Sequence, residues 1–82
     1  MQENKIAVVA IIVEDSVASP KVNEVLHKFG ELIVGRLGIP YRERKLNVIS
    51  IIVDGEPDEI SALTGQLGKI EGVTVKAAVS KK

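Results

Sequence analysis

The residues best suited to binding chemistry lie in one short segment, residues 35–44, which reads GRLGIPYRER. Its arginines can donate paired hydrogen bonds to a carboxylate or a phosphate, and its tyrosine adds a hydroxyl and an aromatic face. Its glycines allow close approach to the backbone. We therefore predict a binding site for a small anionic effector or a protein partner. The predicted site residues are Arg36, Gly38, Tyr41, Arg42 and Arg44.

The sequence offers little for catalysis. It contains no cysteine and one histidine, His27, which lies near the expected end of a helix. A serine nucleophile would need that imidazole as its base, and a histidine in this position is typical of a solvated helix residue. An acylphosphatase-like enzyme would need an arginine after the first strand, where residues 14–19 are acidic. We predict that the protein is not an enzyme and keep an acylphosphatase-like activity as a minor alternative.

Carboxylates follow two of the expected strands, at residues 14–15 and 54–59. We expect them to share one pole of the fold, where oxygen ligands could hold Mg²⁺ or Ca²⁺ weakly. We prefer the simpler interpretation that they complement the positive ends of two helix dipoles. Because the chain also lacks thiolates, we predict no cofactor and no metal site. Basic residues of the segment 42–45 and of both chain ends are expected at the opposite pole.

Length and charge exclude several classes of protein. At 82 residues the chain has room for one hydrophobic core, so residues 1–82 should form a single domain. Eleven basic and eleven acidic residues give a net charge of zero, and one Tyr and one Phe are too few for base stacking. No apolar run approaches the ~20 residues that span a bilayer. We predict a cytoplasmic protein with no direct nucleic-acid binding and no membrane association.

Four strands are expected to position the binding segment. Two short apolar runs indicate buried strands, a weaker run contains a glycine, and the last strand alternates as a half-buried edge strand does. The expected strands cover residues 5–13, 31–37, 45–54 and 73–79. Residues 38–44 are expected to form a loop, because Pro40 cannot donate to a central ladder.

Two helices are expected between these strands. The first has an N-cap at Ser19, proline at its first position and a stop at Gly30. The second begins at Pro57 and ends near Gly68. Each has a single apolar stripe, formed in the first helix by Val22, Val25, Leu26 and Phe29 and in the second by Ile60, Leu63 and Leu67.

The order of elements contains an internal repeat. Residues 6–15 (IAVVAIIVED) align with residues 46–55 (LNVISIIVDG), and each segment is followed by a helix, a glycine and a strand. Two such halves interleave into one sheet. The predicted fold class is α+β: a ferredoxin-like βαββαβ domain, with a four-stranded antiparallel sheet and two helices on one face.

The middle strands, 5–13 and 45–54, are apolar on both of their faces. Since the helices cover one face, the other would expose several hundred Å² of apolar surface, more than a soluble monomer usually tolerates. We predict a homo-oligomer, a dimer or tetramer, that pairs through this open face or through the sheet edges. We assign the odd-numbered residues of these strands to the helix side, which places Ser50, Thr74 and Lys76 on the open face.

The segment GRLGIPYRER, between an AVVAIIVED opening and an ISIIVD strand, resembles a family of small proteins from hydrogenase-bearing anaerobes. That family is described as regulating the iron-only hydrogenase system. The resemblance extends over nearly the whole chain and implies a cytoplasmic, oligomeric regulatory domain of the ACT and nickel-repressor type. Nickel repressors bind metal through His and Cys, of which this chain has only His27, and the turn EDSVASP lacks the glycine of amino-acid-binding ACT domains.

These observations predict a non-enzymatic regulatory module that binds an effector or a partner and regulates an iron-only hydrogenase system. The main alternative is a purely structural oligomeric accessory protein. In that alternative the Gly-Ile-Pro-Tyr segment, residues 38–41, serves only subunit packing. The two hypotheses differ in whether the arginines around this segment are free to bind a ligand.

Overall fold

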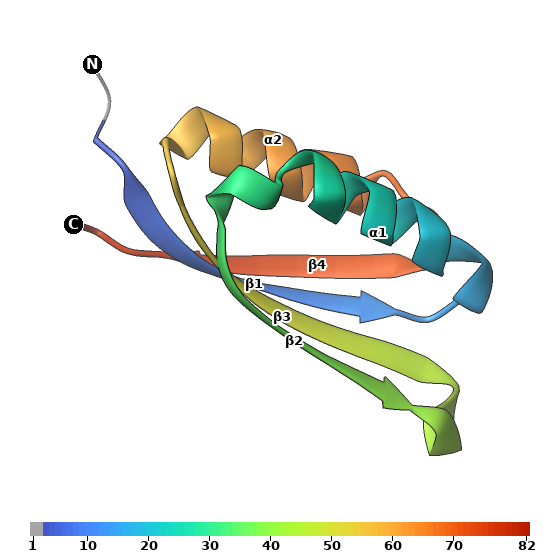
Figure 1. Ribbon diagram of the computed structural model, residues 1–82. Coiled ribbons are helices and arrows are strands. Elements are labelled where there is room, and N and C mark those ends of the chain that lie inside the picture. The colour runs from blue at the N-terminus through green and yellow to red at the C-terminus, as the bar shows by residue number, and fades with distance from the viewer. Residues whose placement is uncertain (1–2) are drawn as a thin grey trace.

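The computed structural model describes residues 3–82 and has the predicted order of elements. The strands are β1 (Lys5–Val13), β2 (Ile33–Tyr41), β3 (Leu46–Gly55) and β4 (Val73–Val79), and the helices are α1 (Ser19–Lys28) and α2 (Pro57–Gly68). Short 3₁₀ helices lie at η1 (Ser16–Ala18), η2 (Gly30–Leu32) and η3 (Arg42–Arg44). The sheet is antiparallel with the order β2-β3-β1-β4, and both helices cover one of its faces (Figure 1). The predicted ferredoxin-like α+β fold is confirmed.

Side-chain alternation in β1 and β3 builds the core. The odd-numbered apolar residues of both strands point toward the helices and are buried: Ala7, Val9, Ile11, Val13, Ile49, Ile51 and Val53. They pack against the apolar stripes of both helices, led by Val22 and Leu26 of α1 and by Ile60, Leu63 and Leu67 of α2. Each fully buried aliphatic side chain contributes about 1.5–3 kcal/mol. The assignment of the odd-numbered residues to the helix side is confirmed.

The start of α1 differs from the prediction. Ser19 is the first residue of the helix, and Ala18 occupies the N-cap position. The capping side chain belongs to Asp15, whose Oδ1 accepts a hydrogen bond of 3.0 Å from the Val17 N–H and caps η1 instead. Gly30 opens η2 after the end of α1. The predicted N-cap at Ser19 is therefore wrong, because a 3₁₀ turn continuous with α1 moved the cap upstream.

The second helix matches its prediction more closely. It begins at Pro57 and its last residue is Gly68. Its first turn is held by a capping box, in which the Glu56 backbone N–H donates to Oε1 of Glu59 at 2.9 Å. No helix within residues 3–82 is long and apolar enough to cross a membrane.

The strand β2 is longer than the sequence indicated. The predicted loop over residues 38–44 is wrong in its first half, because β2 continues to Tyr41 and Pro40 pairs with Asn47 of β3. Proline is tolerated here because β2 is an edge strand, so the missing N–H can lie on the side without a neighbour. The chain reverses in η3, and Lys45 closes the turn in the left-handed conformation with a φ of 56°.

A β-bulge near the start of β2 fixes which side chains face the helices. Ile33 pairs with Val53, but Gly35 pairs with Ile52, so one extra residue of β2 lies between the two pairs. Paired residues of antiparallel strands share a face. Beyond the bulge the even-numbered residues of β2 therefore lie on the helix side: Arg36, Gly38 and Pro40, opposite Ile51, Ile49 and Asn47.

The charged groups do not form the two predicted poles. Because β1 and β3 are antiparallel, Ile6 lies beside Asp54 and Val13 beside Asn47. The acidic groups at 14–15 and 54–59 thus lie at opposite ends of the sheet, about 25 Å apart at the rise of an extended strand. The basic residues divide likewise, since the hairpin tip and the C-terminus lie at opposite ends of the molecule, and Lys5 Nζ donates to the carbonyl of Lys81 near that terminus (Figure 1). Across residues 3–82, no group of three or more acidic, imidazole or thiol side chains could hold a metal ion.

Candidate functional site

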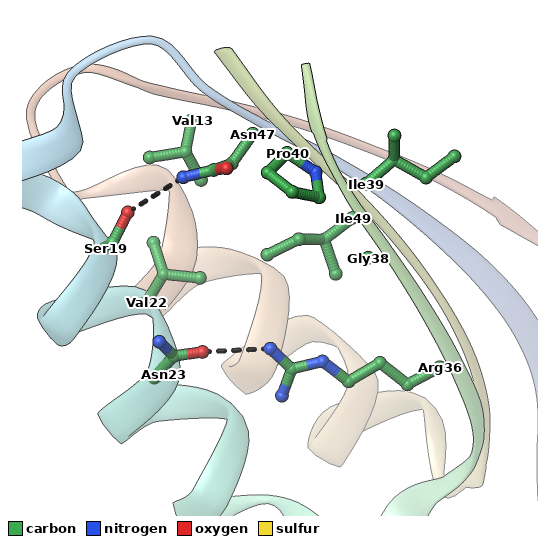
Figure 2. A pocket seen from close by; sticks show the side chains of 10 residues that line it. All are labelled: Val13, Ser19, Val22, Asn23, Arg36, Gly38, Ile39, Pro40, Asn47 and Ile49. Atoms are coloured by element: carbon green, nitrogen blue, oxygen red, sulfur yellow. Dashed lines mark hydrogen bonds between the residues drawn. The ribbon is translucent and has the colours of Figure 1, made fainter. Parts of the chain in front are cut away.

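A groove of about 250 Å³ lies between α1 and the hairpin of β2 and β3. The hairpin extends away from the helices toward its tip, and the groove occupies the angle between them (Figures 1 and 2). Its lining residues come from four elements: Val13, Ser19, Val22, Asn23, Arg36, Gly38, Ile39, Pro40, Asn47 and Ile49. Two of them, Arg36 and Gly38, belong to the predicted site.

Arg36 spans the groove from strand to helix. Its Nη2 donates a hydrogen bond of 2.9 Å to Oδ1 of Asn23 on α1 (Figure 2). The amide is neutral, so this contact orients the guanidinium without compensating its charge. An arginine has five N–H donors, and this contact uses one of them. The arrangement presents an oriented cation at the edge of an apolar hollow.

Gly38 leaves the middle of the groove open. It pairs with Ile49 on the helix side of β2, and a Cβ built at Gly38 would meet nothing within 4 Å. Val13, Val22 and Ile49 supply apolar side chains around this space (Figure 2). Glycine inside a strand weakens the strand and often marks a place where a ligand approaches closely. Gly38 therefore adds open space to the groove between α1 and the hairpin.

The end of the groove nearest the hairpin tip is also polar. Asn47 Nδ2 donates to Oγ of Ser19 at 3.2 Å in a half-buried contact between β3 and α1. Sequence reasoning missed Ser19, Asn23 and Asn47 as site residues. The signal available was that Ser19 and Asn23 are four residues apart, which puts two short polar side chains on one face of a helix. Together with Arg36 these groups can hold an anion, and none of them is a general base for proton transfer.

The remaining predicted site residues lie elsewhere. Tyr41 pairs with Leu46 and faces the open side of the sheet, while Arg42 and Arg44 lie in η3 at the hairpin tip. Tyr41 and Arg42 line a separate hollow at that tip with Pro40 and Glu43. The structure thus brings Arg36 and Gly38 together and separates them from the other three residues.

The face of the sheet away from the helices carries a continuous apolar surface. Eight large hydrophobic side chains on it are between 37% and 61% exposed: Ile6, Val8, Ile12, Leu37, Ile39, Tyr41, Val48 and Ile52. Figure 2 shows the Ile39 side chain pointing away from the groove. Ser50 and Lys76 both pair with Ala10, and Thr74 pairs with Ile12, so the predicted polar residues do lie on this open face.

The comparisons with known proteins agree with this architecture. Residues 5–77 match the model of the TM1266-like family, described as "Iron-only hydrogenase system regulator, putative". The structure of the uncharacterized protein TM1266 from Thermotoga maritima is 39% identical, with a TM-score of 0.92 over 96% of this chain and 100% of that chain. No curated protein matched the chain.

More distant structures share the fold alone. The ACT domain of a GTP pyrophosphokinase from Chlorobium tepidum is 20% identical, with a TM-score of 0.78 over 92% of this chain and 99% of that chain. A formyltetrahydrofolate deformylase from Pseudomonas putida is 8% identical, with a TM-score of 0.66 over 94% of this chain and 29% of that chain. The expected ACT-like architecture is confirmed.

Proposed function

Because the chain belongs to the TM1266-like family of iron-only hydrogenase system regulators, we propose that it is a cytoplasmic, non-enzymatic regulatory module of such a system. The module binds a small anionic effector in the groove between α1 and β2. The ACT-like fold supports a regulatory rather than a catalytic role. A bound effector would contact both α1 and the edge strand β2, which line the groove, and in this proposal it changes what the module contacts.

The observation that carries this proposal is the arginine oriented over an apolar hollow. Arg36 is exposed, and its guanidinium is held 2.9 Å from a neutral amide of Asn23. An arginine that served only the fold would be expected to meet a carboxylate or to extend into solvent. An orientation fixed before binding reduces the entropy lost when a ligand is captured.

The non-enzymatic part of the proposal rests on the groups around the groove. Ser19 Oγ accepts a hydrogen bond from Asn47 Nδ2, and no imidazole lines the groove. His27 lies at the other end of α1, in a hollow that it shares with Phe29 and Glu59. Hydrolytic or acyl-transfer chemistry needs a base within hydrogen-bond reach of the nucleophile. These groups therefore support binding rather than catalysis in the groove.

A thermal-shift screen of carboxylates, inorganic phosphate and nucleotides tests this proposal. We expect at least one anion to raise the melting temperature of the wild-type protein and to lose that effect in Arg36→Ala. The matched control is Arg42→Ala, which removes an arginine from the hairpin tip outside the groove. If Arg42→Ala loses the shift and Arg36→Ala keeps it, the effector site lies at the tip and the proposal is wrong.

A second function is supported by the open face of the sheet. A purely structural accessory protein would use this surface, including Ile39 and Tyr41 of the Gly-Ile-Pro-Tyr segment, for subunit packing. We propose that the module is a homo-oligomer through this face, whichever function holds. Light scattering at micromolar concentration is expected to give at least two chains, and a monomer would contradict this. Saturable anion binding at Arg36 separates the regulatory module from the purely structural protein.

A further inference from the structure

We infer that the groove selects a small organic monoanion with a branched apolar body and without an ammonium group. This inference rests on the proposed anion binding and adds the chemical class of the ligand. Three features of the groove carry it: its charge, its size and the space above Gly38.

The charge of the groove is positive and uncompensated. Arg36 is the one charged residue among the ten that line it, all of which belong to the described residues 3–82. A carboxylate can accept two parallel hydrogen bonds from the guanidinium. An ammonium group brought in with that carboxylate would find amide and hydroxyl oxygens but no carboxylate to neutralise it. The ligand should therefore carry one negative charge and no positive charge.

The size of the groove limits the ligand. A volume of about 250 Å³ lies just below the range of about 300–1,000 Å³ that is typical of small-molecule pockets. A short-chain acid suits a groove of this size, whereas a nucleotide is several times larger. Inorganic phosphate would reach the guanidinium but leave the apolar part of the groove unfilled.

The space above Gly38 requires an apolar body. Val13, Val22 and Ile49 are among the residues that line it, and a Cβ at position 38 would meet no other atom within 4 Å. Burial of a branched hydrocarbon there removes apolar surface from water on both partners, which adds to affinity. Arg36 and Gly38 are two residues apart and lie on the same face of β2, about 7 Å from each other along the strand. A single small molecule can therefore contact both.

The inference is tested with three probes of nearly equal size: 4-methylpentanoate, L-leucine and 4-methylpentanamide. Leucine adds an ammonium group to the first probe, and the amide removes its charge. Titrations of the full chain are followed through backbone amide shifts in two-dimensional NMR spectra. We expect 4-methylpentanoate to bind at least 10-fold more tightly than either of the others, with the largest shifts at Arg36 and Gly38. Equal or tighter binding of leucine or of the amide would overturn the inference.

Two glycine variants supply a matched control. Gly38 and Gly35 both lie in β2, and a Cβ at either would meet nothing within 4 Å, but Gly35 pairs with Ile52 on the opposite face. We expect Gly38→Val to weaken 4-methylpentanoate binding at least 10-fold and Gly35→Val to leave it unchanged. Equal effects of the two variants would contradict an apolar subsite above Gly38.

Acetate and inorganic phosphate separate this inference from the proposed function. If both shift the Arg36 amide and 4-methylpentanoate binds no more tightly than acetate, an anion site exists and the apolar class is wrong. If none of the carboxylates or phosphate shifts Arg36, anion binding itself fails, and the proposed function fails with it.

Discussion

The two sides of β2 differ sharply from each other. Toward the helices it presents Arg36, Gly38 and Pro40, one cation and two residues that leave space. Toward the open face it presents Leu37, Ile39 and Tyr41, three bulky side chains that are between 47% and 61% exposed. One strand thus contributes a hollow on one side and an apolar surface on the other. The proposed ligand binding and the proposed self-association should therefore respond to different substitutions in β2.

The largest effects on stability and on oligomeric mass are expected when a charged side chain is introduced on one or the other face of β1. Val9 is fully buried under the helices, so Val9→Glu should cost more than about 4 kcal/mol and unfold the protein. Val8 is 45% exposed on the open face, so Val8→Glu should keep the fold and release monomers. Circular dichroism and light scattering measure the two outcomes.

The control for this pair is Val17→Glu, because Val17 is 75% exposed and lies in η1, outside the sheet. It should keep both fold and oligomer. If Val8→Glu retained the mass of the wild-type oligomer, the edges of the sheet rather than its open face would hold the subunits together.

A smaller effect, on the affinity for an anion, is expected from the substitution Asn23→Asp on the helix side of the groove. The substitution replaces the neutral partner of Arg36 with a carboxylate at the same 2.9 Å contact. We expect anion affinity to fall about 10-fold or more, since the guanidinium charge is then compensated, while an exposed ion pair changes stability by about 0.2–1 kcal/mol. Calorimetric titration of the anion found in the screen measures this. Unchanged affinity would show that Arg36 binds no ligand.

A still smaller effect on stability is expected at the two glycines of β2. Both Gly38→Val and Gly35→Val should raise the free energy of unfolding by about 0.5–1 kcal/mol, because valine suits a strand and neither site is crowded. Urea denaturation measures both. A stability loss in Gly38→Val alone would mean that the groove is too narrow for a side chain and therefore for a ligand.

The smallest effect is expected from removal of divalent cations. The acidic groups at residues 14–15 and 54–59 lie at opposite ends of the sheet, and within residues 3–82 no group of three or more acidic side chains could hold a metal ion. Dialysis against a chelator should change the melting temperature by less than about 1 °C, and elemental analysis should find no stoichiometric zinc or nickel. A tightly held ion after dialysis would contradict this.

The sequence was sufficient for the fold class and the order of elements, and a glycine lies within two residues of the end of each helix. The middle strands are apolar on both faces, so their pattern alone did not decide which face is buried, and the alternating burial comes from the packing of the helices. The prediction of one acidic pole and one basic pole is wrong for a single reason. The ferredoxin-like topology makes β1 and β3 antiparallel, which places the carboxylates that follow them at opposite ends of the sheet.

The candidate site was only half predictable. Arginine and glycine types in residues 35–44 pointed to Arg36 and Gly38, but their partners Asn23, Ser19 and Asn47 come from two other elements. Only the packing of α1 against the hairpin brings these residues together. The predicted loop over residues 38–44 rests on Pro40, whose place on an edge strand depends on the sheet order rather than on local sequence.

The bulge between Ile33 and Gly35 has a consequence for how such proteins can diverge. Deletion of the single extra residue would shift the phase of the strand by one and exchange its two surfaces. The arginine and the glycine would then point outward, and Leu37, Ile39 and Tyr41 would fill the hollow. Deletion of one residue would therefore convert a chain with an open groove into a chain with a filled groove and an arginine on its outer surface. Loss or gain of an effector site in this fold requires no new side chains.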